Sequence, residues 1–241
     1  MTKPTRLTTL RPLNHVGLSL DGNGRWAEQR GLPVIAGYRA GSESLTRAVL
    51  ALARAGVPFV TAQVFTTDNW SRRSTDLSAI FDAISEWAQS SVNLLCNAGV
   101  RVAWTGHRER VPTHLHESLI ELELASAENS NMLLTLAIDY GGREELVQAS
   151  QRIRHIHCNN HDPCFTLQEY SATFEGPWTP DIDLYVRSGG RHRLSNGMLW
   201  KLAYSELYFT DTLWPDFTSA HLKQAIGWYR TSARTFGGNR E

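Results

Sequence analysis

The sequence has little of what secreted, membrane-spanning or nucleic-acid-binding proteins need. Three cysteines in 241 residues are too few for the disulfide framework of a small secreted domain, and they favour free thiols in a reducing compartment. No run approaches the ~20 apolar residues that span a bilayer, and the start has no apolar stretch like that of a signal peptide. Twenty-four basic residues balance twenty-four acidic ones, so no positive excess attracts nucleic acid. We therefore expect a cytoplasmic protein whose anion sites are local.

Two standard nucleotide-binding motifs are also absent. The sequence contains neither G-x-G-x-x-G, which binds dinucleotides, nor G-x-x-x-x-G-K-[ST], which binds nucleoside triphosphates. Any phosphate site must therefore be built in another way.

What is present indicates one α/β domain. Short apolar runs alternate with longer segments of helical period, the pattern of parallel βαβ units. We expect a single domain over residues 1–241, with a flexible segment at 1–14 and a central, mostly parallel sheet flanked by helices. The predicted strands are His15–Leu20, Phe59–Phe65, Val100–Trp104, Met132–Ile138 and Ile182–Arg187.

The predicted helices lie between these strands. Leu45, Ala48, Val49 and Leu52 have helical spacing in a segment that Gly56 stops. A long helix runs from Thr75 to near Gly99, another opens at Pro112, and a third runs from near Arg143 to about Ile156.

Polar, glycine-rich segments follow four of the five predicted strands: DGNGRW, TTDNWSRR, DYGGR and SGGRHRLSN. Because the carboxyl ends of parallel strands share one edge of a sheet, these segments should converge there. Glycines let backbone N–H groups approach an oxyanion, and arginines match phosphate oxygens with forked donors. We therefore expect a phosphate cage formed by Arg25, Arg72, Arg187 and Arg193.

Each element also has a plainer interpretation. A single GNGR loop after a strand is weak support for phosphate binding, and the arginines taken singly could be solvated surface. Trp26, Phe65 and Trp70 lie within or beside the polar segments, as would suit an apolar ligand with a charged head. Zinc is a weaker alternative, because the spacing in HIHCNNHDPC (155–164) matches no standard finger.

As a set, six segments resemble the cis-prenyltransferases in order and spacing, from about His15 to Phe217. They are HVGLSLDGNGRW, RGLPVIAGYRAG, FTTDNWSR, YGGR, RSGGRHRLSN and ELYFTDTLWPDF. The resemblance implies a homodimer whose fold is not a dinucleotide-binding Rossmann domain, with an apolar tunnel beside the sheet. It also implies Mg²⁺-dependent condensation of an allylic diphosphate with isopentenyl diphosphate. A long lipid product would favour peripheral membrane contact, although no basic amphipathic anchor is obvious.

The resemblance assigns roles to individual residues. Asp21 would engage Mg²⁺ and the diphosphates, and Glu206 would be the second metal carboxylate. Asn69 occupies the position to which the family assigns proton removal, but a neutral amide is a poor base, so we favour an orienting role. The residues implied to bind substrate are Gly22, Asn23, Gly24, Arg25, Trp26, Thr66, Thr67, Asp68, Trp70, Arg72, Arg187, Arg193, Leu194 and Ser195.

The chain departs from the family pattern at several positions. Val34 replaces an arginine, Tyr38 a histidine, Arg191 an acid and Gly197 a bulky residue, while Val64 stands where long-chain members often have alanine. Three hypotheses follow. The chain is a working cis-prenyl diphosphate synthase, or a specialised relative that makes a short or branched product, uses another acceptor or cyclises its substrate. The third, a non-catalytic subunit, conflicts with the retained Asp21.

Overall fold

Six parallel strands form the centre of the molecule in the computed structural model, which describes residues 11–157, 164–174 and 178–232. Their order is β3-β4-β2-β1-β5-β6, and every neighbouring pair is parallel. This confirms the predicted fold class. The strands are β1 (His15–Ser19), β2 (Phe59–Thr66), β3 (Val100–Thr105), β4 (Met132–Tyr140), β5 (Leu184–Arg187) and β6 (Glu206–Phe209).

Five of these strands were predicted because most of their residues are buried. Every residue of β1 and of β5 is buried, so the sequence there reads as a continuous apolar run. The sixth strand, β6, was missed. It is a four-residue edge strand whose side chains are half-buried or exposed, so no buried apolar run marks it.

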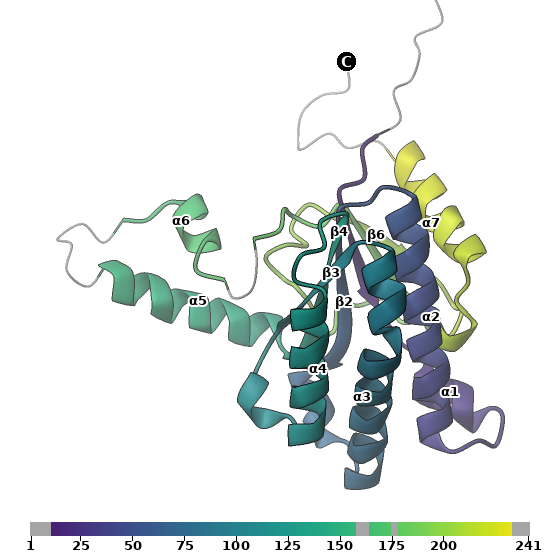
Figure 1. Cartoon of the computed structure of the whole chain (residues 1–241). Helices are drawn as coiled ribbons and strands as arrows, with labels where there is room; N and C mark the ends of the chain where they lie inside the picture. The colour runs from purple at the N-terminus through teal and green to yellow at the C-terminus, as the bar shows by residue number, and fades with distance from the viewer. Residues whose placement is uncertain (1–10, 158–163, 175–177, 233–241) are drawn as a thin grey trace, which may run out of the picture.

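Helices and 3-10 turns connect the strands. Figure 1 shows α2, α3 and α4 side by side over one face of the sheet, α7 beside α2, and α5 projecting from the body with α6 packed along its middle. The elements are α1 (Asn23–Glu28), α2 (Val34–Arg54), α3 (Ser74–Asn97), α4 (Thr113–Ala125), α5 (Gly142–His157), α6 (Leu167–Ser171), α7 (Ser219–Thr231), η1 (Thr67–Ser71), η2 (Arg108–Arg110) and η3 (Trp214–Asp216).

The main core lies between the sheet and the helices α2, α3 and α4. As predicted, α2 buries Leu45, Ala48, Val49 and Leu52 along one face. A smaller apolar cluster covers part of the other face of the sheet. It consists of Ala137, Tyr140, Ile182, Tyr185, Met198 and Leu202.

Helix α2 begins earlier than its apolar stripe indicated, because its first turns pack on α1 through glycine. A Cβ at Gly37 would lie 2.1 Å from the backbone oxygen of Asn23, and one at Gly41 would lie 2.3 Å from the Asn23 side-chain oxygen. These two glycines therefore let α1 approach α2 closely enough to hold Asn23 in place.

The amino-terminal segment is tied to the body where the structure describes it. Residues 11–14, which we expected to be flexible, include Arg11, paired with Glu206, and Pro12, whose backbone oxygen accepts a hydrogen bond of 2.8 Å from the Tyr229 hydroxyl. Residues 1–10 and 158–163, which include two members of the weak zinc motif, lie outside the described residues. Within the described part of the chain, no helix is both long and apolar enough to cross a membrane.

Candidate active site

The loops that follow β1, β2 and β5 line one cavity of about 360 Å³ at the carboxyl edge of the sheet. Three of the four polar segments thus converge as predicted, and all four arginines of the expected cage line the cavity. The predicted site residues in its lining are Asp21, Gly22, Asn23, Gly24, Arg25, Thr66, Asn69, Arg72, Arg187, Arg193 and Ser195.

A sharp turn after β1 carries Asp21 into the cavity. Gly22 has a φ of +120°, and a Cβ there would lie within about 3 Å of Leu213, so the turn requires glycine. The Asp21 backbone oxygen accepts hydrogen bonds from the Trp214 N–H at 3.0 Å and from the Ser188 hydroxyl at 2.8 Å. The end of β1 is therefore fixed by two segments that lie far away in sequence.

The Asp21 carboxylate bridges two arginines. Arg25 Nη2 lies 2.9 Å from Oδ1, and Arg187 Nη2 lies 2.9 Å from Oδ2. The Arg187 side chain is only 4% exposed, and its other terminal nitrogen donates to the Arg193 backbone oxygen and the Ser195 hydroxyl. Its Nε–H is buried and has no hydrogen-bond partner within the described residues. The Arg187 guanidinium is thus held in place mainly by its two terminal nitrogens.

Tyr38, one of the departures from the family pattern, lines the cavity and accepts a hydrogen bond from Arg72. Burial raises the pKa of the Tyr38 hydroxyl above its ordinary value, although the Arg72 charge opposes the shift. Tyr38 is therefore a neutral phenol that holds the Arg72 guanidinium at the rim of the cavity.

The residues after β2 are set by a capping box in η1. The Thr66 backbone N–H donates to Asn69 Oδ1 over 3.1 Å, so the amide NH₂ of Asn69 is the part left to face a ligand. Trp70 packs edge-on against Phe65, and its Nε1 donates to the buried Asp139 over 2.7 Å. Trp70 therefore supports the cavity from behind, outside its lining.

Other predicted residues lie near the cavity without lining it. Trp26 donates through Nε1 to Asp216 over 2.8 Å. Thr67, Asp68 and Leu194 also lie outside the lining among the described residues.

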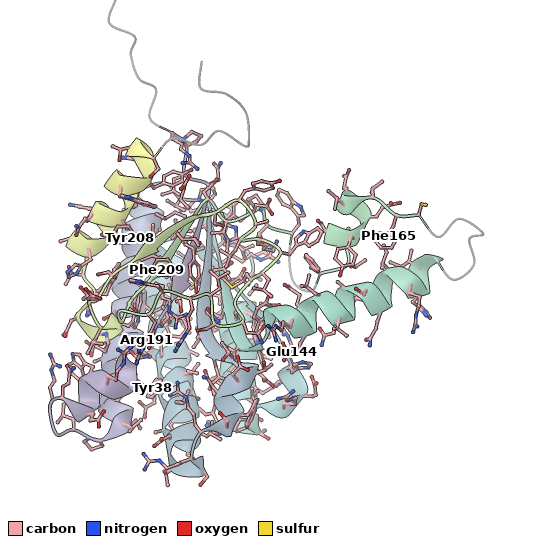
Figure 2. All side chains as sticks on the ribbon, turned by 180° about the vertical axis from the view of Figure 1, so that it is seen from behind. Tyr38, Glu144, Phe165, Arg191, Tyr208 and Phe209 are labelled. Carbon is pink, nitrogen blue, oxygen red and sulfur yellow. The ribbon has the colours of Figure 1, made fainter. Side chains whose placement is uncertain are left out.

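The fourth polar segment, after β4, braces the other loops. Figure 2 labels Glu144 at the start of α5, where its carboxylate accepts hydrogen bonds from Thr67 at 3.1 Å and from the Asn196 amide at 3.0 Å. The Asn196 backbone oxygen accepts the Gly142 N–H over 2.8 Å. Sequence reasoning predicted that these segments converge, but it missed Glu144 and Asn196 because no local pattern shows which side chains join the two loops.

Glu206 is a predicted site residue that the structure places away from this cavity. In the register of β5 and β6, Glu206 is opposite Leu184, whereas Phe209 is opposite Arg187. Glu206 therefore lies three residues, roughly 10 Å along the strand, from the edge that carries Arg187. Its carboxylate pairs with Arg11 at 3.1 Å. Within one chain, Glu206 and Asp21 therefore do not line the same cavity, and a metal shared by the two stays a prediction.

The remaining departures have different surroundings. Arg191 is exposed, and Val34 begins α2 outside the cavity lining in the described structure. A Cβ at Gly197 would lie 3.0 Å from the Leu194 backbone oxygen and 3.1 Å from Gln63 Oε1, so a bulky residue there would displace Gln63.

Comparison with known proteins identifies the family. Residues 20–237 match the family model described as "Putative undecaprenyl diphosphate synthase". The chain belongs to this family. It is 38% identical to an isoprenyl transferase of Aquifex aeolicus over 229 residues (95% of this chain, 97% of the relative) and 39% identical to one of Chromobacterium violaceum over 230 residues (95% and 90%).

A solved structure supports the same assignment. Lavandulyl diphosphate synthase from Lavandula x intermedia, in complex with dimethylallyl diphosphate, is 29% identical to this chain. It superposes with a TM-score of 0.88 over 93% of this chain and 98% of its own. The chain is thus a prenyltransferase, a cis-prenyl diphosphate synthase.

Proposed function

We propose that this prenyltransferase binds two diphosphates side by side in the 360 Å³ cavity and joins their prenyl groups. The allylic diphosphate would lie on the Gly22–Arg25 turn and Arg72, and isopentenyl diphosphate on Arg187, Arg193 and Ser195. The observation that carries this proposal is the gathering of four guanidinium groups and one carboxylate in one cavity. The chain as a whole has no net charge, so this local excess of positive charge marks an anion site.

The chemistry follows from these contacts. When the allylic C–O bond breaks, negative charge develops on the leaving diphosphate, and fixed arginines at its oxygens stabilise that charge. Holding the acceptor double bond against the allylic carbon supplies the alignment. The Asn69 NH₂ can donate to a diphosphate oxygen or to a water that takes the proton, and it cannot itself act as the base.

Asp21 fits the magnesium ion that the family resemblance implies. Mg²⁺ binds through one or two carboxylates together with substrate phosphate oxygens and waters, and Asp21 offers one carboxylate beside the proposed diphosphate positions. The described residues contain no cluster of three or more His, Cys, Asp or Glu side chains that could hold the ion alone. Bound there, the ion would neutralise diphosphate charge. Asp21 would hold the ion, and Arg25 and Arg187 would bind diphosphate oxygens beside it.

Two copies of the chain are proposed to pair through the α5–α6 arm. The arm exposes Val147, Ile156, Phe165 and Leu167, each by 48% or more, and a second copy would cover them. We also propose a cytoplasmic location. Sedimentation of the purified protein tests the pairing: a monomer at micromolar concentration would contradict it.

The experiment that tests the reaction uses dimethylallyl, geranyl and farnesyl diphosphates, each with and without isopentenyl diphosphate, in the presence of Mg²⁺. Dimethylallyl diphosphate is included because the structurally similar Lavandula enzyme binds it. We expect product only when both substrates are present. Turnover of an allylic diphosphate alone would overturn the synthase in favour of a specialised relative that ionises one substrate. Condensation with another acceptor would overturn the role of isopentenyl diphosphate.

A further inference from the structure

The active-site cavity continues into a second, apolar cavity between α2, α3 and the sheet. Both cavities are lined by Leu20, Asn23, Tyr38, Val64 and Ile80, so these residues form the neck between them. A prenyl tail that starts at the diphosphate site and avoids water would enter through this neck.

The far side of the apolar cavity is closed by bulky side chains. Ile84 and Trp87 follow Ile80 of the neck along one face of α3 at helical spacing, and both line the apolar cavity alone. Trp87 is 5% exposed, and its Nε1 donates a hydrogen bond of 2.8 Å to the Thr46 hydroxyl on α2. This bond ties the indole to both helices, so a growing tail would have to break it and expel a buried ring.

The space behind the neck is small. Its volume is about 30 Å³, and a cavity needs roughly 10–15 Å³ to hold one water molecule. It therefore has no room for a long polyprenyl tail. The core around it is close-packed, so additional length is not available without displacing side chains.

We infer that this prenyltransferase stops after one or two condensations, and that Trp87 and Ile84 set this limit as specificity-determining residues. The inference rests on the proposed function, because it assigns the tail of the proposed product to this cavity. In each condensation the allylic C–O bond breaks with release of diphosphate, a C–C bond forms to the acceptor, and the acceptor loses one proton. The chain thus grows by five carbons a step until it meets the indole.

The wild-type enzyme gives the first test. Dimethylallyl diphosphate and labelled isopentenyl diphosphate are incubated with enzyme and Mg²⁺, and the dephosphorylated products are separated by chain length and weighed by mass spectrometry. We expect main products of ten or fifteen carbons. Main products of twenty carbons or more would overturn the inference and leave the proposed function standing. Absence of any isopentenyl incorporation would overturn both.

The second test enlarges the apolar cavity at its far side, the floor formed by Ile84 and Trp87. Trp87→Leu and Ile84→Ala should each add at least one isoprene unit to the main product, whereas Trp104→Leu should not. Trp104 is a matched control, since it is a buried tryptophan, 2% exposed, on β3 outside this cavity. Folded Trp87→Leu or Ile84→Ala protein with unchanged product length would overturn the role of that residue.

A binding measurement needs no variant and remains decisive if both substitutions prevent folding. Non-hydrolysable thiolodiphosphates with tails of five and twenty carbons are titrated into the wild-type enzyme. The short tail should bind at least tenfold more tightly, because the long one does not fit behind the neck. Equal or tighter binding of the long tail would overturn the inference.

Discussion

Replacing Asp21 by alanine should weaken the fold as well as the chemistry. The Asp21 carboxylate pairs with Arg187, whose side chain is 4% exposed, while Asp21 itself is 27% exposed. Removing one partner of a buried ion pair leaves the other charge uncompensated and costs about 3–5 kcal/mol. Because solvent reaches part of Asp21, we expect a loss of about 3 kcal/mol in the free energy of unfolding, at the lower end of that range.

Urea unfolding measures this loss. The transition midpoint of Asp21→Ala should fall while its slope stays unchanged. Asp76→Ala is the matched control, because it also removes a carboxylate paired with an arginine, but Arg73 is 79% exposed. Exposed pairs contribute less than about 1 kcal/mol. Equal midpoints for the two variants would refute the reasoning that Asp21 compensates a buried charge.

The same substitution separates two roles of Asp21 in ligand binding. Without metal, the carboxylate competes with an anion for Arg25 and Arg187, so Asp21→Ala should bind pyrophosphate about tenfold more tightly in the presence of a chelator, a gain of about 1.4 kcal/mol. With Mg²⁺ the order should reverse, and turnover should be lost. Calorimetry with pyrophosphate follows both conditions. Weaker binding by the variant in chelator would contradict the competition.

Three further predictions concern other parts of the molecule. Arg193→Ala should raise KM for isopentenyl diphosphate far more than KM for the allylic substrate, and equal changes in steady-state kinetics would contradict the proposed division of the cavity. Burial lowers the pKa of His15 to about 4, so stability should fall as pH drops from about 6.5 to 4, by roughly 3 kcal/mol. Urea midpoints across that range test this, with His15→Gln expected to flatten the profile and an unchanged slope contradicting it. Val64→Ala widens the neck and leaves the floor intact, so it should lengthen the product less than Trp87→Leu; a larger shift on product analysis would place the limit at the neck.

The fold could be predicted because buried strands and helix faces have recognisable patterns of apolar residues in the local sequence. Strands β1 and β5 lie between neighbouring strands and have continuous apolar runs, and α2 has its stripe of leucine, alanine and valine. The edge strand β6 has no such run, since its four residues are half-buried or exposed. Missing β6 also explains why the position of Glu206 was not predicted. Without the register of β6, the motif could not show that Glu206 lies at the end of the strand away from Arg187.

Those site residues could be predicted that follow a strand directly in the sequence. Asp21, Arg25, Arg72 and Arg187 each stand within a few residues of a strand end, so topology alone brings them together. The contacts that hold the loops were not predictable in this way. The hydrogen bond from Asn196 to Glu144 joins residues 52 positions apart, and no local period or motif reports such a pair.

Two of the departures from the family pattern, Tyr38 and Val64, act on the same cavity, as the proposed short product requires. Tyr38 contacts Arg72 at the diphosphate end and also lines the apolar cavity, so one substitution alters the cage and narrows the neck. The Val64 side chain is larger than alanine and narrows that neck, and the Trp87 side chain closes the apolar cavity behind it. Of the departures, Tyr38 and Val64 lie in the proposed path of the tail, whereas Arg191 is exposed and Val34 lies outside the lining of both cavities in the described structure. We therefore expect substrate binding and product length to be coupled, and Tyr38→His combined with Trp87→Leu should lengthen the product more than either change alone when products are weighed by mass spectrometry.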